Sequence, residues 1–259
     1  MKLSGKILQN NSVIYEYLEG IYKKYNNNSF IQTDPIFFPK RYEDPKDIEI
    51  IAFISSAFAF GRVLQINKIL TNLINTIGKR PYKYFSNFLE DDFDKSFINF
   101  RYRFVDFYQL KYFFFGISSI IKKYGTIENC FLTKNETIWD GLTSIYKSFE
   151  NGNYLIPNPE KGSACKRFNL FLRWMVRYDN IDFGIWKRVK KSDLILPCDT
   201  HIFEIGKKLN FTKRKTISRK TAIEITDGFK KLNPKDPVKY DFALTRAGIL
   251  ENNNFLLQV

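Results

Sequence analysis

The sequence is poor in the residues that build metal centres, disulfide frameworks and membrane spans. Its 259 residues include one histidine and three cysteines, Cys130, Cys165 and Cys198. An odd number of widely spaced cysteines forms no disulfide framework and cannot supply a four-cysteine centre. We therefore expect no metal, no other cofactor and a reducing, cytoplasmic location. No apolar run reaches the roughly 18 residues of a membrane span, and "MKLSGKILQNNSVIYEYLEG" lacks the apolar core of a secretory signal, so we expect no membrane partner.

Acidic residues are also scarce, since 27 Asp and Glu stand against 41 Lys and Arg, a net charge of +14. Residues 1–150 are net +4 and residues 151–259 are net +10. Residues 161–220 alone hold 16 basic and five acidic residues. Such a concentration of positive charge is typical of a protein that binds a polyanion, and it favours a nucleic acid partner. The alternative is a Lys- and Asn-rich composition whose lysines are simply solvated.

Strand-like alternation is scarce and helical periodicity is common. Residues 44–78 open with an Asp-Pro helix start, and Gly61 is expected to break them into two helices. Further helices are expected at 106–125, 136–150, 165–178, 199–211, 218–232 and 238–250. The length fits one large domain or two modest lobes. We predict an all-α, two-lobed domain over residues 1–259.

The helix that follows the Asn-, Gly- and Pro-rich segment 151–164 carries a row of cations. At about 100° per residue, Lys166, Leu170, Arg173 and Arg177 share one face. The opposite face is apolar and is expected to be core: Phe168, Phe171 and Met175. This pattern predicts that the cations project outward along one stripe, where they could bind phosphates or form an ordinary solvated face.

Lys166 begins this helix directly after the small residues of "KGSAC". A cation is mildly disfavoured at a helix N-terminus, and small residues let a phosphate or another backbone come close. A lysine in this position is suited to act as a nucleophile once it loses a proton.

Asp199 stands in "LPCDTHIFEIGKKLNF" (196–211), beside the only histidine, His201. An aspartate immediately before an apolar helix is a good N-cap. A catalytic carboxylate that faces a nucleophile on another helix would explain the same residue.

Three segments resemble the helix–hairpin–helix DNA glycosylases, including endonuclease III and the 8-oxoguanine glycosylases. "PCDTHIFEIGKKL" resembles their Val-Asp-Thr-His segment, and Gly162 precedes Lys166 by four positions, as a hairpin glycine precedes their catalytic lysine. "AFISSAFAFGRVLQINKIL" is similar to a helix with a Ser-Ala-Gln segment and an Asn-Lys pair. The separation of 33 residues between Lys166 and Asp199 resembles the archaeal 8-oxoguanine glycosylases. "KRFNLFLRWMVR" and "DPVKYDFALTRAGI" are similar to an uncharacterised bacterial family of the same superfamily.

This resemblance implies a two-lobed glycosylase-like fold and a bifunctional DNA glycosylase and AP lyase of base excision repair. The enzyme would be a nucleoid-associated monomer that extrudes an oxidised purine, 8-oxoguanine-like, from double-stranded DNA. Lys166 and Asp199 would be catalytic, within an active-site segment 151–211. Leu170 would line the base pocket, and Phe58, Trp174 and Trp186 are its candidate stacking partners, with a place in the hydrophobic core as the alternative for each. The DNA-binding residues would be Gly162, Ser163, Arg167, Arg173, Arg177 and His201, the last also a structural residue of its helix.

The sequence departs from the superfamily at three points. "LIPNPEKGSA" replaces the Leu-Pro-Gly-Val-Gly hairpin, so an atypical hairpin is expected. Phe58 stands where relatives place the glutamine that fills the space of the flipped base. No cysteine follows Cys198, so the iron–sulfur ligands of endonuclease III are absent. A non-enzymatic helix–hairpin–helix module that binds DNA or RNA, or a helical protein-interaction scaffold, would need no Lys/Asp pair.

Overall fold

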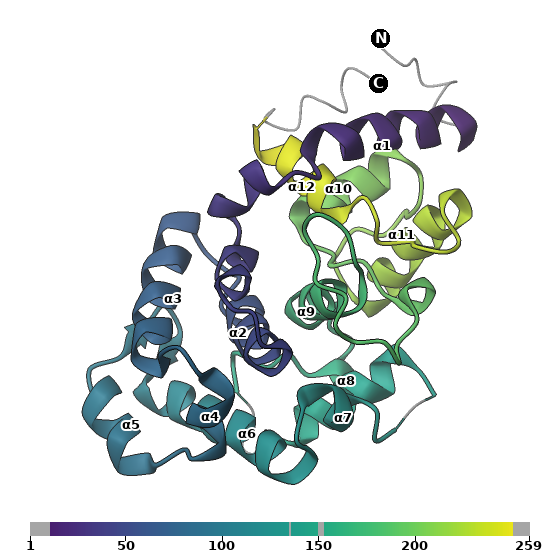
Figure 1. The fold of residues 1–259 in the computed structure, drawn as a ribbon. Coiled ribbons are helices and arrows are strands. Elements are labelled where there is room, and N and C mark those ends of the chain that lie inside the picture. The colour runs from purple at the N-terminus through teal and green to yellow at the C-terminus, as the bar shows by residue number, and fades with distance from the viewer. Residues whose placement is uncertain (1–10, 135, 150–152, 251–259) are drawn as a thin grey trace. The chain divides into compact units, whose positions relative to one another are not determined.

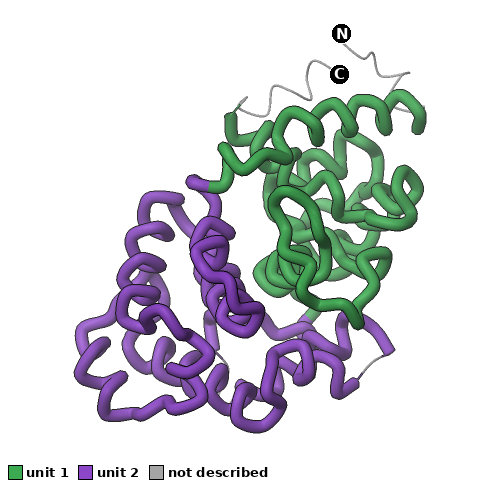
Figure 2. The backbone as a smooth tube through the Cα atoms, viewed as in Figure 1, with its two compact units in different colours: residues 1–31, 162–259 green, residues 32–161 purple. Residues whose placement is uncertain are grey.

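The chain folds into two compact units that are mostly helical (Figures 1 and 2). The computed structural model describes residues 11–134, 136–149 and 153–250. Unit 1 comprises residues 1–31 and 162–259, and unit 2 comprises residues 32–161. The expected all-α class is confirmed, because the described residues contain a single two-stranded sheet. Parts of the N-terminal stretch and of the segment 151–211 (residues 1–10, 151 and 152) lie outside the described residues.

Unit 2 begins with two 3₁₀ helices, η3 (Pro35–Phe37) and η4 (Pro39–Arg41), and ends with a third, η5 (Pro159–Lys161). Strands β1 (Arg101–Tyr102) and β2 (Val105–Asp106) form an antiparallel hairpin. The α-helices of this unit are α2 (Pro45–Ala57), α3 (Val63–Ile77), α4 (Pro81–Ser86), α5 (Glu90–Phe97), α6 (Phe107–Tyr124), α7 (Ile127–Phe131) and α8 (Ile138–Lys147).

The predicted break between α2 and α3 is confirmed at Gly61. Asp44 caps α2 by accepting from the backbone N–H groups of Lys46 and Asp47, and Pro45 occupies the first helical position. Gly61 has φ +107°, a left-handed value that residues with a side chain rarely adopt. The chain can therefore turn sharply there before α3 begins.

Helices α6, α7 and α8 are placed by caps and by close packing. Asp106 caps α6, and Gly125, with φ +79°, ends it. The buried Glu49 of α2 accepts from the backbone N–H groups at the start of α7, Ile127 at 2.9 Å and Glu128 at 3.0 Å. Gly116 of α6 packs directly on the Phe149 ring, which a Cβ at that position would meet at 2.1 Å.

Helix α9 (Lys166–Val176), labelled in Figure 1, belongs to unit 1, and most of its residues are buried. Helix α1 contacts α11 and α12, and α10 also contacts both of them. The other elements are α1 (Asn11–Tyr25), η2 (Asn28–Thr33, which runs into unit 2), η6 (Lys191–Asp193), α10 (Thr200–Lys208), α11 (Arg219–Leu232) and α12 (Asp241–Leu250). Among the described helices, none combines the length and the apolar character that crossing a bilayer requires.

Candidate active site

Lys166 enters α9 from a tight turn in which the backbone twice adopts left-handed geometry. Gly162 has φ +73°, and Cys165, the residue before the helix, has φ 47°. A left-handed backbone conformation such as that of Cys165 costs a residue with a side chain roughly 1–2 kcal/mol. Local bonds hold the turn: Ser163 Oγ accepts from the N–H of Cys165 at 3.1 Å, and the buried Asn169 amide donates to the Ala164 carbonyl at 2.9 Å. Lys166 therefore leaves the helix end in a fixed direction.

Asp199 uses its two carboxylate oxygens for different purposes. Oδ1 accepts from the backbone N–H of Ile202 at 2.9 Å and so caps α10, as the sequence predicts. Oδ2 lies 3.3 Å from Nζ of Lys166. The Lys166 side chain is 37% exposed and that of Asp199 is 17% exposed. The structure thus brings together two residues that are 33 positions apart, at the N-termini of α9 and α10, and leaves the amine accessible to solvent.

A second carboxyl group, that of Asp241 at the start of α12, lies within electrostatic range of this pair. Burial and, to a smaller degree, the negative charge of Asp199 raise the pKa of Asp241 to about 6, against the attraction of Arg173. Cys198 is also buried there. Burial and the two carboxylates raise the pKa of its thiol to about 12, so it is protonated near neutral pH.

Arg173 and Arg177 are the centre of a buried ion network. Arg173 donates through Nε to Asp182 at 3.3 Å and through Nη1 to Asp241. Arg177 donates through Nε to both oxygens of Asp236 at 3.0 Å and through Nη1 to Asp179 at 3.0 Å and to Asp182. Four carboxyl groups therefore surround two guanidinium groups inside unit 1.

Burial and the neighbouring charges shift the pKa values of the residues in this network. Burial opposes the charge of Arg177, but three carboxylates hold its pKa well above the ordinary value. Burial would raise the pKa of Asp179, yet Arg177, two backbone N–H groups and the hydroxyl of Tyr22 in α1 lower it below the ordinary value. Burial dominates at Asp182 and raises its pKa. The Tyr22 hydroxyl donates to Asp179 at 2.9 Å and so attaches α1 to the same network.

The prediction that Arg173 and Arg177 project outward to bind phosphates is wrong. They share a helix face with Lys166, as their spacing indicates, but they are only 2% and 3% exposed. The turn 179–182 and the start of α12 cover that face and supply its carboxylates. Helical periodicity identified the face correctly and could not show what covers it.

The assignment of Phe58, Trp174 and Trp186 to the base pocket is wrong for a related reason. Trp174 and Trp186 are 0% and 2% exposed, and Trp186 packs edge-on against Phe171 at a centroid distance of 5.3 Å. Phe58 is fully buried within unit 2, where it contacts other aromatic rings: Phe60, Phe100, Tyr102 and Phe113. None of the three can stack on a base without opening the core of its unit, so each is a core residue.

The remaining predicted residues keep access to solvent. Leu170, one turn after Lys166, is half-buried, and Gly162 and Ser163 are exposed in the turn before α9. Their assignments to the base pocket and to phosphate binding stay predictions. Arg167 and His201 are half-buried and make contacts of their own. Where an atypical hairpin is expected, the chain forms η5 and a turn at Gly162, whose carbonyl accepts from the N–H of Arg219 at 2.8 Å.

Sequence reasoning missed Asp241 and the three other carboxylates of the network. One signal was available: Arg173 and Arg177 stand among Phe171, Trp174 and Met175, in the C-terminal part of a helix that is otherwise apolar from residue 170 onward. Arginines among so many large apolar residues are expected to be buried, and a buried arginine requires carboxylates. Within the described part of the chain, no cluster of His, Cys, Asp or Glu is arranged to hold a metal ion.

We expect Arg177→Met to destabilise the protein by about 3–5 kcal/mol at neutral pH, because it leaves buried carboxylates without their cation. Urea denaturation measures the change. Lys187→Met, at an exposed position of the same unit, is the control and should stay within about 0.5 kcal/mol of wild type. If both variants unfold at the wild-type urea concentration, the network contributes nothing to stability.

Asp241 gives the free energy of unfolding a pH dependence of defined sign. Its pKa is about 6 when folded and 3.8 ordinarily, so the folded chain holds a proton that the unfolded chain has released. The stabilising contribution of this proton is complete below about pH 4 and is lost as the pH rises through 6. The stability of wild type relative to Asp241→Asn should fall by up to about 3 kcal/mol between pH 4 and pH 7. A constant or rising difference in paired urea titrations would contradict this assignment.

One family matches the chain. Residues 34–250 match the family described as "Protein of unknown function (DUF2400)". No curated protein matches the chain, and no solved structure matches it. The match covers Lys166 and Asp199 as well as the two arginines and four carboxylates of the buried network, whereas Tyr22 precedes it. The chain belongs to the DUF2400 family.

Proposed function

We propose that this protein is a DNA N-glycosylase with AP lyase activity that removes an oxidised purine, with Lys166 as nucleophile and Asp199 as its acid–base partner. The observation that carries the proposal is the 3.3 Å approach of Nζ of Lys166 to Oδ2 of Asp199 at two helix N-termini. The amine is accessible to a substrate, while the carboxylate is held by its capping bond to Ile202.

The reaction would begin with the transfer of one proton from the Lys166 ammonium to Asp199 or to solvent. The amine then forms a bond to C1′ of the sugar, and the glycosidic bond breaks as the base leaves with its electron pair and takes up a proton. Loss of a second proton from the nitrogen and opening of the sugar ring give a Schiff base. Removal of a C2′ proton then expels the 3′ phosphate by β-elimination. A carboxylate at the position of Asp199 would also stabilise positive charge that develops on the sugar.

Because Arg173 and Arg177 are buried, we expect exposed cations of unit 1 to make the DNA contacts in their place. Several lysines of the basic segment 161–220 are exposed: Lys187, Lys190, Lys191, Lys213, Lys215 and Lys220. Exposed cations of this density can neutralise phosphates, and the binding would weaken as salt rises. The same surface would serve a non-enzymatic DNA-binding module, so the Lys/Asp pair is what distinguishes an enzyme from that alternative.

We expect borohydride to trap a covalent adduct between the wild-type protein and a duplex that carries an oxidised purine or an abasic site. Lys166→Gln should abolish the adduct, because the amide side chain cannot form a Schiff base. Lys231→Gln is the control, since it removes an exposed lysine of the same unit that lies outside the basic segment 161–220, and it should leave trapping intact. An undiminished adduct in Lys166→Gln would place the nucleophile elsewhere, and no adduct on any lesion would favour the binding module.

Asp199→Asn separates capping from catalysis, because asparagine caps a helix about as well as aspartate but carries no charge and accepts no proton from an ammonium. The variant should fold, melt near wild type and bind lesion DNA. Its single-turnover base excision should fall about 10²-fold or more. Asp199→Ala should show the same catalytic defect and a further loss of about 1 kcal/mol of stability. Wild-type excision by folded Asp199→Asn would reduce this residue to a cap.

A further inference from the structure

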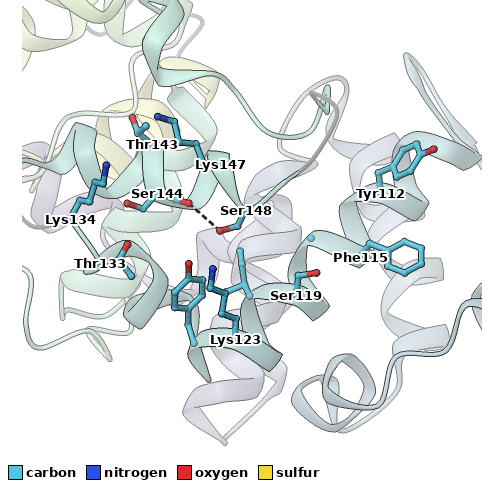
Figure 3. A pocket seen from close by; sticks show the side chains of 13 residues that line it. Tyr112, Phe115, Ser119, Lys123, Thr133, Lys134, Thr143, Ser144, Lys147 and Ser148 are labelled. Carbon is cyan, nitrogen blue, oxygen red and sulfur yellow. Dashed lines mark hydrogen bonds between the residues drawn. The ribbon is translucent and has the colours of Figure 1, made fainter.

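Unit 2 contains a cavity of about 600 Å³ that the Lys166 site does not use. Figure 3 shows its lining, which comes from α6, from residues just after α7, and from α8. All of these elements belong to unit 2. The volume lies within the range of small-molecule sites in proteins, about 300–1,000 Å³.

The charge of the cavity has one sign. Lys123, Lys134 and Lys147 line it, from α6, from the α7–α8 connection and from α8 respectively, and no acidic side chain is among its lining residues (Figure 3). Lys147 pairs with Glu160 at 3.1 Å, but both side chains are more than half exposed, so the pair is readily exchanged for another anion. Within the described residues, no carboxylate pairs with Lys123 or Lys134. Three ammonium groups around one hollow favour an anionic ligand.

The hydroxyl groups of the cavity add acceptors to these donors. Thr133 and Thr143 donate their hydroxyl protons to the backbone carbonyls of Cys130 and Trp139, both at 2.8 Å. The Ser144 hydroxyl likewise donates its proton to the backbone carbonyl of Asp140 at 3.1 Å. With their protons committed to the backbone, these oxygens present lone pairs to the cavity. The ligand that they fit therefore carries O–H or N–H groups in addition to its negative charge.

Aromatic side chains form a further part of the lining. Tyr112 and Phe115 lie together on α6 at one side of the cavity (Figure 3), and Tyr124 ends the same helix. Tyr112 is 45% exposed, so its ring is open to a flat partner. Stacking on such rings is a common and sequence-tolerant way for proteins to hold a nucleobase.

We propose that this cavity binds a nucleotide. The lysines hold the phosphate, the threonine and serine oxygens accept from the sugar hydroxyls or the base N–H groups, and the α6 aromatics hold the base. Inorganic phosphate alone would leave the acceptors and the rings unused, and a neutral nucleoside would leave the lysines unused. The shared chemistry is that of a phosphorylated nucleoside, which exists both as a free nucleotide and within a nucleic acid strand.

Calorimetric titration of the full chain at low salt with ATP, ADP, AMP, adenosine and inorganic phosphate tests the proposal. The nucleotides should bind at least about tenfold more tightly than adenosine or phosphate. Lys123→Ala and Lys134→Ala should each weaken nucleotide binding about tenfold, because each removes one charge-assisted contact. Lys122→Ala is the matched control: it removes the neighbouring exposed lysine of α6, which does not line the cavity, and should leave the affinity within about twofold.

A second arm distinguishes the two sources of the nucleotide. Equal affinity for dTMP and for each site of a short oligothymidylate identifies a free nucleotide, whereas tighter binding of the strand through Lys123 and Lys134 identifies a nucleotide within nucleic acid. The proposal is overturned if nothing binds at millimolar concentrations, if phosphate binds as well as the nucleotides, or if Lys122→Ala weakens binding as much as Lys123→Ala. Borohydride trapping on the same variants reports on the Lys166 site alone, so either proposal can fail without the other.

Discussion

The buried contacts of Arg173 and Arg177 are the constraint on which the rest of unit 1 depends. A guanidinium group that is almost fully buried is tolerated only when carboxylates surround it, and here they come from a turn (Asp179, Asp182), from the α11–α12 connection (Asp236) and from the start of α12 (Asp241). These contacts fix the axis of α9. Since Lys166 is the first residue of that helix, they also fix the position from which its amine extends.

One carboxyl group of this network also lies near the proposed catalytic pair. Asp241 binds Arg173 and lies close enough to Asp199 and Lys166 for their charges to affect its pKa. Its pKa is raised to about 6, so the carboxyl group is mostly protonated below that pH and adds little negative charge beside Asp199 there. Asp199 itself is held by α10 through its capping bond, and its second oxygen remains available to the amine. The site thus combines one fixed carboxylate with one accessible amine.

Unit 2 is organised differently, because aromatic packing rather than buried charge holds it together. Phe53, Phe113 and Phe149 stack on one another, and Gly116 allows Phe149 to lie directly against α6. This packing places the basic cavity along α6 and α8. The two units therefore carry two different proposed chemistries: covalent catalysis at a Lys/Asp pair in unit 1, and nucleotide binding among lysines and hydroxyl groups in unit 2.

Local signals in the sequence were enough to determine most helices and one detail of the site. Asp44, Asp106 and Asp199 are N-caps because a short acidic side chain before an apolar helix satisfies its first N–H groups, and glycines end or separate helices where positive φ is needed. Helices α4 and α5 had too few residues to show a period.

What only the tertiary structure decided is exposure. Helical spacing placed Arg173 and Arg177 on the face of Lys166, but their partners are up to 68 positions away, and local periodicity cannot reveal which distant segment covers a face. Phe58, Trp174 and Trp186 were assigned wrongly for the same reason, because the pattern that indicates an aromatic wall is the same whether solvent or the core lies beyond it.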